Sequence, residues 1–412
     1  MDSVLTCMVS DQLGPGVRLD EFTSEVARLL SGASCVALRE YERAIELTFD
    51  ALGLEAGDSI ILSPLAPAVY ADVLKERGII PLFCDVDMAT ANLDLDAAER
   101  MIERLEARFS DAGSASSPGV PKSGGHAGDA TGDGAGNAPG DGTGDTPENT
   151  PAGGEVSGHT SGQTEETAYG ADEINGDGYP AEARITRMPK AVLLDSPLGA
   201  PYSANRLETL ELPVIEDASH GLGAGEDGHT TGTLGKFTIL SLEPESIFTT
   251  GGGAAVVARG RSEKTALKKA AESLRTTSLL PDMNASLGLA QIRALGTYIE
   301  RRREVADVFR RSVMQGRHKA PASGETAVPF AFPVMLDGAA KDVISYARKK
   351  DVEAVWAFSE TIMAVADYWD ECPSERFPAA SALLLRCLLF PLYPTLTKAD
   401  IERISKVLTT LP

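Results

Sequence analysis

The sequence predicts an α/β fold: a large domain with a mainly parallel sheet covered on both faces, followed by a smaller α/β domain. Short apolar runs, typical of strands buried on both faces, alternate with segments of helical periodicity along most of the chain. This alternation stops at about residue 283, where a long helix begins. We therefore expect a large domain of residues 1–110 and 180–282 and a small C-terminal domain of residues 283–412.

The N-terminal elements follow from the spacing of apolar residues. From Leu19 to Leu30 these residues recur at helical spacing, and Cys35 to Leu38 form a short apolar strand. A second helix is expected from Tyr41 to Leu52, and Gly53 should stop it because glycine readily adopts the left-handed conformation that ends helices. The next elements are, in order, a strand at Ser59–Pro64, a helix at Val69–Arg77 and a strand at Pro81–Val86.

Four further apolar runs predict strands in the second half of the large domain. They lie at Ala191–Leu194, Val214–Ile215, Phe237–Leu242 and Ala254–Ala258. The small domain begins with a long helix that includes Ile299–Val313. Its other predicted elements are a strand at Phe330–Leu336 and helices at Ala340–Lys349 and Lys398–Leu408.

Residues 111–179 separate the two halves of the large domain and differ from them in composition. Gly, Ser, Thr, Asp, Pro and Ala dominate, with only three large aliphatic residues. Between Asp111 and Ala183, thirteen acidic residues stand against one basic residue, so this segment carries about 12 of the 22 net negative charges. So little apolar surface cannot offset the entropy of ordering, and we expect a disordered, acidic insertion that acts as a spacer. The alternative is a segment that recruits a basic partner.

The overall composition excludes several classes of function. A net charge of −22 opposes binding to nucleic acid or to an anionic membrane surface. The five cysteines follow no spacing of metal ligands, and we expect reduced, mostly buried thiols and a cytoplasmic location. No run of eighteen apolar residues is present, so no membrane span is expected.

Seven sequence blocks, in order along nearly the whole chain, resemble the DegT/DnrJ/StrS family of pyridoxal-phosphate sugar aminotransferases. They are FDALGLEAGDSIILSP, PLFCDVDMATANLD, PVIEDASHGLGA, GTLGKFTILSL, TTGGGAAVV, LGLAQIRALGTYIERRREVADVF and LFPLYPTLTKADIERI. The resemblance implies a fold-type-I aminotransferase frame and a site between the large domain and a partner subunit. It also implies a lysine Schiff base with pyridoxal phosphate and transfer of an amino group from glutamate to a keto-sugar nucleotide, in the biosynthesis of surface polysaccharides.

Three residues keep the family pattern of cofactor contacts. Asp217 ends the strand segment PVIED, where open α/β sheets present ligand-binding groups, and the resemblance places its carboxylate against the pyridine nitrogen. By the same resemblance, His220 lies near the ring oxygen of the cofactor and Ser241 contacts the phosphate. From the residues alone, Asp217 and His220 equally fit a capped turn after a strand, and Ser241 fits a structural hydroxyl.

The residue that should form the Schiff base is absent. Ser246 occupies the family's lysine position before the segment IFTTGG, and a hydroxyl cannot form an imine with an aldehyde. The next lysines along the chain, Lys236 and Lys264, lie outside this loop. An active enzyme would need a lysine from an unexpected segment, for which Lys236 and Lys190 are the candidates by sequence.

Three other family features are altered. The phosphate-binding Ser-Gly-Thr is replaced by Arg39, Glu40, Tyr41 and Glu42, which read as a helix start with a solvated, charged face. The aromatic lid reads SPLAPA, and the block that reaches the partner subunit reads Thr277–Leu280. The His-Tyr-Pro loop reads WAFSE, in which we expect Trp356 and Phe358 to belong to the core.

These replacements predict a degenerate homologue that folds but does not transaminate. Such a protein could bind a nucleotide sugar, or pair with an active relative and regulate it. A homodimer is expected, because the family builds its site across a two-fold interface and the helix from Gly288 to Phe309 is retained. The alternatives are an active aminotransferase with a non-standard lysine and a binding module based on the acidic insertion.

Overall fold

The computed structural model describes residues 2–9, 13–114, 182, 184–321, 324, 326–368 and 370–412. The predicted disordered insertion, residues 111–179, lies outside these residues apart from its first four. Those four continue the helix α5 (Leu95–Ser114), for which the sequence patterns gave no prediction. Met1–Ala112 and Gly178–Pro412 together form one compact unit.

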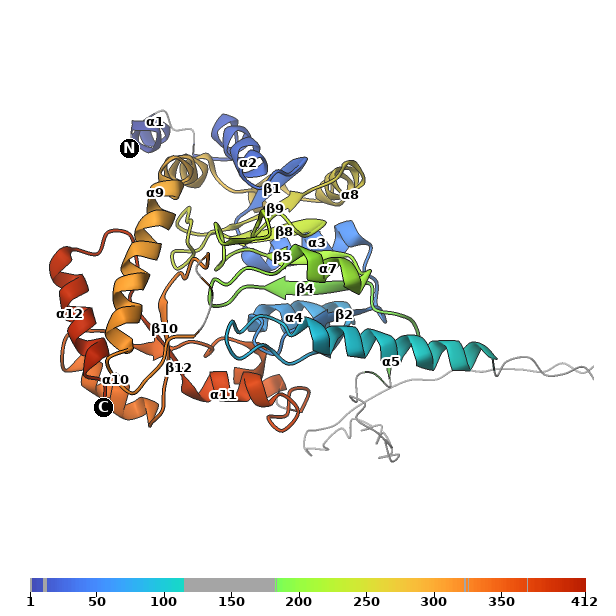
Figure 1. Cartoon of the computed structure of the whole chain (residues 1–412). Helices are drawn as coiled ribbons and strands as arrows, with labels where there is room; N and C mark the ends of the chain where they lie inside the picture. Colours follow the sequence, from blue (N-terminus) through green and yellow to red (C-terminus); the bar gives the residue numbers. More distant parts are fainter. Residues whose placement is uncertain are drawn as a thin grey trace, which may run out of the picture. The chain divides into compact units, whose positions relative to one another are not determined.

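A seven-stranded, mainly parallel sheet lies at the centre of the large part of the structure, as predicted. Its order is β1-β9-β8-β5-β4-β2-β3, and the first six labels run from top to bottom in Figure 1. Strands β3, β2, β4, β5 and β8 pair in parallel, whereas β9 runs antiparallel between β8 and β1. The strands are β1 (Ser34–Leu38), β2 (Ser59–Leu62), β3 (Ile80–Phe83), β4 (Ala191–Asp195), β5 (Val214–Asp217), β8 (Phe237–Ser241) and β9 (Ala254–Ala258).

Helices bury both faces of this sheet. Alternate residues of β9 belong to different cores: Ala255 and Val257 pack in the cluster of α2 (Val17–Leu29), and Val256 packs in the cluster of α3 (Tyr41–Leu52). This alternation follows from the two-residue repeat of a strand and explains why the strands read as continuous apolar runs. The other helices of this part are α4 (Ala68–Arg77), α5, α7 (Ala204–Leu207) and α8 (Arg261–Ala271).

The helix α9 (Asp282–Val313) begins close to the position expected for the long helix, and its first residue is acidic and buried. Asp282 accepts hydrogen bonds from the backbone N–H groups of Gly16 at 2.7 Å and Leu19 at 2.9 Å. Because Gly16 has no side chain, the carboxylate of Asp282 takes the place of a capping residue for α2. The two helices are thereby joined at their N-termini (Figure 1).

A second, antiparallel sheet with the order β10-β12-β11 follows α9. Its core is formed with α9 and two further helices, α10 (Ala340–Arg348) and α12 (Lys398–Thr409). The strands are β10 (Phe332–Met335), β11 (Val355–Trp356) and β12 (Cys387–Phe390). The shorter elements are α1 (Asp2–Val9), β6 (Gly225–Glu226), β7 (His229–Thr230), α11 (Pro378–Arg386), and the 3₁₀ helices η1 (Glu208–Leu210), η2 (Thr276–Ser278), η3 (Ile362–Ala364) and η4 (Ala366–Tyr368).

Two sequence predictions about individual residues are confirmed. Cys35, Cys84, Cys372 and Cys387 are free thiols, and all of them except Cys35 are buried, as is Cys7. Gly53 ends α3 in the left-handed conformation. In the part of the chain that the structure describes, no helix is both long enough and apolar enough to cross a bilayer.

Gly253, which precedes β9, packs closely against Leu38 of β1, and a substitution can test this contact. Its φ is +107°, and a Cβ atom there would lie 2.5 Å from the backbone oxygen of Leu38. We expect Gly253→Ala to lower the free energy of unfolding by about 2–4 kcal/mol, because backbone strain and a clash with backbone add. Gly53→Ala is the matched control, since its φ is +68° but its Cβ would meet open space, and about 1–2 kcal/mol is expected. Equal losses in urea denaturation would contradict the clash.

Candidate functional site

A cavity of 720 Å³ lies at the carboxyl ends of the parallel strands. Asp195 ends β4, Asp217 ends β5 and Ser241 ends β8, and all three line the cavity. Its lining also includes Trp356 of β11 and Arg302 of α9. Open α/β sheets present ligand sites at this edge, so the cavity is the candidate functional site.

The structure brings the sequence-predicted residues together. Asp217, His220, Ser241 and Ser246 all line this one cavity. Ser246 is 7% exposed, and its hydroxyl lies 3.3 Å from that of Ser241. Sequence reasoning therefore found residues of one site, although it gave no information about their hydrogen-bond partners.

The two candidate lysines lie elsewhere. Lys190 and Lys236 each precede their strand, β4 or β8, by one residue, whereas Asp195, Asp217 and Ser241 end theirs. Because these strands are parallel, both lysines are at the opposite edge of the sheet from the cavity. The Nζ atom of Lys190 is 2.7 Å from the carboxylate of Asp58. No lysine is among the described residues that line the cavity.

Asp217 has no free acceptor position for a further donor. Its Oδ2 atom accepts hydrogen bonds from the hydroxyls of Tyr41 and Tyr70, the latter at 2.7 Å. Its Oδ1 atom accepts from the backbone N–H of Ser219 at 3.0 Å and from the Ser219 hydroxyl. An ionised carboxylate offers about four lone-pair positions, and these four donors fill them.

Tyr41 has a different role from the one its sequence context indicated. The solvated, charged face predicted for the start of α3 describes Arg39, Glu40 and Glu42, which are exposed. For Tyr41 the prediction is wrong, because its ring is edge-on to that of Tyr70, with centroids 6.0 Å apart, and its hydroxyl reaches Asp217. Burial, followed by the charge of Asp217, raises the pKa of Tyr41 well above its usual value, so the hydroxyl stays protonated and donates.

Ser219 connects Asp217 to the end of β8. Its hydroxyl donates to Asp217 and accepts from the backbone N–H of Ser241 at 2.7 Å. The hydroxyl of Ser246 in turn donates to Ser241. These hydrogen bonds link the end of β8 to Asp217 through Ser219, and the hydroxyl of Ser241 lines the cavity.

Asp195 was missed by sequence reasoning and is the most unusual group in the cavity. It is 5% exposed, and neither carboxylate oxygen has a hydrogen-bond partner among the described residues. Burial, and secondarily the charge of Asp217, raises its pKa from 3.8 to about 7. The two residues are paired in register on adjacent parallel strands, so their side chains point to the same face. The only sequence signal was an acidic residue at the end of the run AVLLD.

Arg302 keeps its positive charge at neutral pH, whereas burial favours the neutral form of His220. Arg302 is 6% exposed and donates through Nη1 to the carbonyl oxygens of Phe330 at 2.6 Å and Leu392 at 2.7 Å. Burial lowers its pKa to about 10. The ring of His220 stacks on Phe330, with centroids 4.2 Å apart. Burial lowers the pKa of His220 and so favours the neutral imidazole, while the charge of Asp217 acts in the opposite direction.

The lining as a whole is acidic. Among the described residues that line the cavity, Arg302 is the only arginine or lysine, whereas six residues carry carboxylates. The six are Asp195, Asp217, Glu243, Glu245, Glu353 and Glu360. A cavity lined mainly by one sign of charge attracts ligands of the opposite sign and repels a dianion.

The aromatic residues of the segment WAFSE were expected in the core, and this is only partly correct. Phe358 is buried, whereas Trp356 is half-buried, and both line the cavity. The segment SPLAPA contributes Leu65 and Pro67, neither of which has an aromatic ring. Of the block Thr277–Leu280, Leu280 donates its N–H to the backbone of β1.

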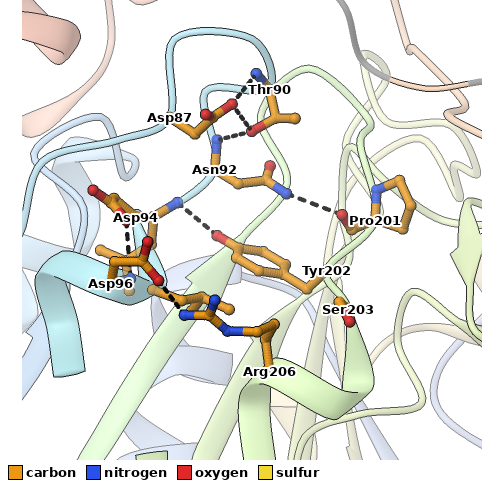
Figure 2. Close-up of a pocket in the computed structure, with 11 residues that line it drawn as sticks. Asp87, Thr90, Asn92, Asp94, Asp96, Pro201, Tyr202, Ser203 and Arg206 are labelled. Atoms are coloured by element: carbon orange, nitrogen blue, oxygen red, sulfur yellow. Dashed lines mark hydrogen bonds and ion pairs between the residues drawn. The ribbon is translucent and has the colours of Figure 1, made fainter.

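A second, smaller cavity of 230 Å³ lies between the loop that leads from β3 into α5 and the segment of residues 201–206 (Figure 2). Its polar groups are engaged in local structure: Asp87 accepts from the backbone N–H and the hydroxyl of Thr90, both at 2.9 Å, and Tyr202 accepts from the N–H of Leu93 at 2.8 Å. No group of three or more potential metal-ligating side chains occurs among the residues described. We therefore interpret this cavity as a space between loops that are held together by local hydrogen bonds.

The main cavity does not supply what pyridoxal phosphate requires. The carboxylate of Asp217 is occupied by protein donors, so it has no acceptor position left for a ring nitrogen. No lysine among the described residues lines the cavity, and its acidic lining opposes a phosphate dianion. The residues present therefore do not fit this cofactor in the arrangement that the structure shows.

Comparisons with known proteins identify the relatives of this chain. A model of the DegT/DnrJ/EryC1/StrS aminotransferase family matches residues 1–107 and 171–409. A dTDP-4-dehydro-2,3,6-trideoxy-D-glucose 4-aminotransferase from Saccharopolyspora spinosa is 22% identical over 440 residues, which span 98% of this chain and 92% of the relative.

Solved structures show the same fold. A putative sugar aminotransferase from Streptococcus pneumoniae, in its PMP form, superposes with a TM-score of 0.72 at 14% identity, covering 99% of this chain and 93% of the other. The structure of DesI in the presence of its TDP-sugar product gives a TM-score of 0.69 at 18% identity, with coverage of 99% and 88%. The fold-type-I frame expected from the sequence is thus confirmed.

Proposed function

The chain belongs to the DegT/DnrJ/EryC1/StrS aminotransferase family, and from this premise we propose that it is a member that no longer transaminates. It keeps the family fold and a cavity at the strand ends. The cavity then serves to bind a ligand without forming a covalent bond to it. Ser246 stands where a Schiff-base lysine would be required, and Asp217 has a structural role in place of a catalytic one.

The observation that carries this proposal is the set of four hydrogen bonds on Asp217. For the carboxylate to bind a cofactor ring, Tyr41 would have to leave Oδ2. Its hydroxyl would then lose a charge-assisted hydrogen bond worth about 1.5–3 kcal/mol. Tyr41 thus competes directly for the one cofactor-binding group that the sequence retains.

The main alternative is an active aminotransferase that uses a non-standard lysine. The positions of Lys190 and Lys236 weigh against it, because each precedes its strand and lies at the opposite edge of the packed sheet. A second alternative, a non-catalytic partner of an active relative, is compatible with the proposal. This alternative differs from the proposal only in that the chain would assemble with an active relative.

Several family-based expectations stay predictions for this chain. They are the homodimer, the cytoplasmic location, a place in surface polysaccharide biosynthesis, and the division at about residue 283. A nucleotide-sugar ligand is also suggested, since one relative was crystallised with a TDP-sugar product. The acidic lining of the cavity argues against the diphosphate part of such a ligand.

A borohydride-trapping experiment tests the proposal. The purified protein is incubated with pyridoxal phosphate, reduced and mapped by mass spectrometry. We expect only low labelling, spread over exposed lysines. Lys190→Arg and Lys236→Arg are the matched controls, because arginine keeps the charge but forms no reducible imine. Stoichiometric labelling of Lys190 or Lys236 that is lost in the corresponding arginine variant would show that the chain forms a Schiff base, as an active aminotransferase does. The proposal would then be wrong.

A further inference from the structure

Within the described residues, Arg302 is a buried positive charge without an ionic partner. The residue is 6% exposed and lines the main cavity from α9. Burial is the one cause that shifts its pKa, so no carboxylate of the described residues is close enough to offset the charge. Buried charges in proteins are normally paired, because an uncompensated charge is costly to remove from water. A negatively charged ligand would supply the missing partner.

The guanidinium group of Arg302 is held in place by two backbone oxygens of the lining. Its Nη1 atom donates to the carbonyls of Phe330 at 2.6 Å and Leu392 at 2.7 Å, and both of these residues also line the cavity. The two bonds use both N–H groups of Nη1 and fix the plane of the guanidinium. Binding to a fixed guanidinium costs little side-chain entropy.

One nitrogen of this guanidinium is left for a ligand. The Nε atom is unpaired but fully buried, so no ligand reaches it. The Nη2 atom has no hydrogen-bond partner among the described residues either, yet it does not belong to the atoms that are both fully buried and unpaired. The Nη2 atom therefore keeps accessible surface. Because Arg302 lines the cavity, a ligand oxygen there can accept a hydrogen bond from Nη2.

The carboxylates of the lining do not cancel this charge. Asp217 is saturated by four donors, and Asp195 is buried with a pKa raised to about 7. The other four acidic residues are exposed, and salt screens exposed charges. They are Glu243, Glu245, Glu353 and Glu360. At one separation, a charge pair is about four times stronger at the effective dielectric constant of a protein site than in water. Close to Nη2, the attraction of one anionic group therefore outweighs this screened repulsion.

The remaining lining fits a hydroxylated carbon skeleton. The exposed glutamates are acceptors for the hydroxyls of a ligand, but they repel a second anionic group. Trp356 is half-buried and Tyr393 is exposed, and their rings offer apolar faces to the carbon atoms of such a ligand. A volume of 720 Å³ lies within the range of small-molecule sites.

We infer that the main cavity binds a small hydroxylated monocarboxylate of the sugar-acid class, with its carboxylate on the Nη2 atom of Arg302. The inference rests on the proposed function in one respect, since it requires that pyridoxal phosphate does not occupy the cavity. It predicts that one carboxylate strengthens binding relative to the neutral molecule of the same skeleton. It also predicts that a second carboxylate gives no further gain.

Isothermal titration calorimetry with three molecules of one carbon skeleton tests this inference. Sorbitol carries no carboxylate, gluconate carries one and glucarate carries two. The native full-length protein is titrated at pH 7 without pyridoxal phosphate. Gluconate is expected to bind about tenfold more tightly than sorbitol, as a charge-assisted hydrogen bond allows, and glucarate no more tightly than gluconate.

Variants at two adjacent arginines of α9 assign the preference to one side chain. Arg302→Gln should abolish the preference for gluconate over sorbitol. Arg301→Gln is the matched control and should retain it, because Arg301 pairs with Glu304 at 3.0 Å and does not line the cavity. Since Arg302→Gln also removes two bonds to the backbone, Arg302→Lys is the second variant. It keeps the charge but loses the planar fork, so a preference of roughly threefold should remain.

Three results would overturn the inference. The first is equal binding of gluconate and sorbitol, or binding of neither, in native protein whose unfolding transition shows it to be intact. The second is tighter binding of glucarate than of gluconate, and the third is an undiminished preference in folded Arg302→Gln. All are read without pyridoxal phosphate, so they are distinct from failure of the proposed function, which appears as a borohydride-stable adduct on lysine.

Discussion

Replacing Asp217 by asparagine is expected to lower the free energy of unfolding by about 3–5 kcal/mol. Asparagine has one acceptor oxygen, so its NH₂ group must face either the two tyrosine hydroxyls or the two donors of Ser219. Two buried donors are then left without an acceptor, each at about 1–3 kcal/mol, and the charge that all four donors stabilised is gone. Urea denaturation monitored by circular dichroism measures the loss.

A single-donor variant provides the control for this prediction. Tyr41→Phe removes one hydrogen bond to Asp217 and leaves three, so a smaller loss of about 1.5–3 kcal/mol is expected. If Asp217 were instead kept free for a ligand, Asp217→Asn would leave the stability of the ligand-free protein unchanged or raise it. That outcome would remove the structural role assigned to this carboxylate.

Asp195→Asn is expected to stabilise the protein at pH 8 by up to about 4 kcal/mol and to leave it unchanged near pH 3. The pKa of Asp195 rises from 3.8 in the unfolded chain to about 7 in the fold, and a pKa difference of one corresponds to about 1.4 kcal/mol. Asparagine mimics the protonated carboxyl, which the buried site prefers. The difference in unfolding free energy between variant and native protein is measured by denaturation from pH 3 to pH 8.

The direction of this effect follows from proton binding. Because the folded-state pKa is the higher one, the folded protein binds the proton more tightly, and this stabilising contribution is fully present below pH 3.8. It is lost as pH rises through about 7. The groups that interact electrostatically with Asp195 are Asp217, Tyr41 and Tyr202, and all of them are common to variant and native protein. The difference therefore reports Asp195 itself.

An exposed aspartate serves as the control for the pH experiment. Asp367 lies at the surface, and Asp367→Asn should change stability by less than about 0.5 kcal/mol, with no marked pH dependence. A flat difference between Asp195→Asn and native protein across this range would show that the carboxylate is hydrated or paired.

The sequence was a good guide to the elements but a poor one to the orientation of side chains. The end of α3 at Gly53 was predictable because helix termination is a local property of the backbone. The inward direction of Tyr41 was not, because it depends on Asp217 and Tyr70, which are 176 and 29 residues away. Its neighbours Glu40 and Glu42 are charged, and this local pattern indicated a solvated face.

The sequence by itself determined that the chain has a family frame, that a serine stands at position 246, and that Asp217 ends a central strand. Only the tertiary structure decided that Asp195 and Asp217 lie side by side, that Tyr41 donates to Asp217 while Asp195 stays buried without a partner among the described residues, and that Lys190 and Lys236 lie at the far edge. The physical reason is that backbone preferences act between near neighbours. The pairing of buried charges depends instead on which strands lie side by side.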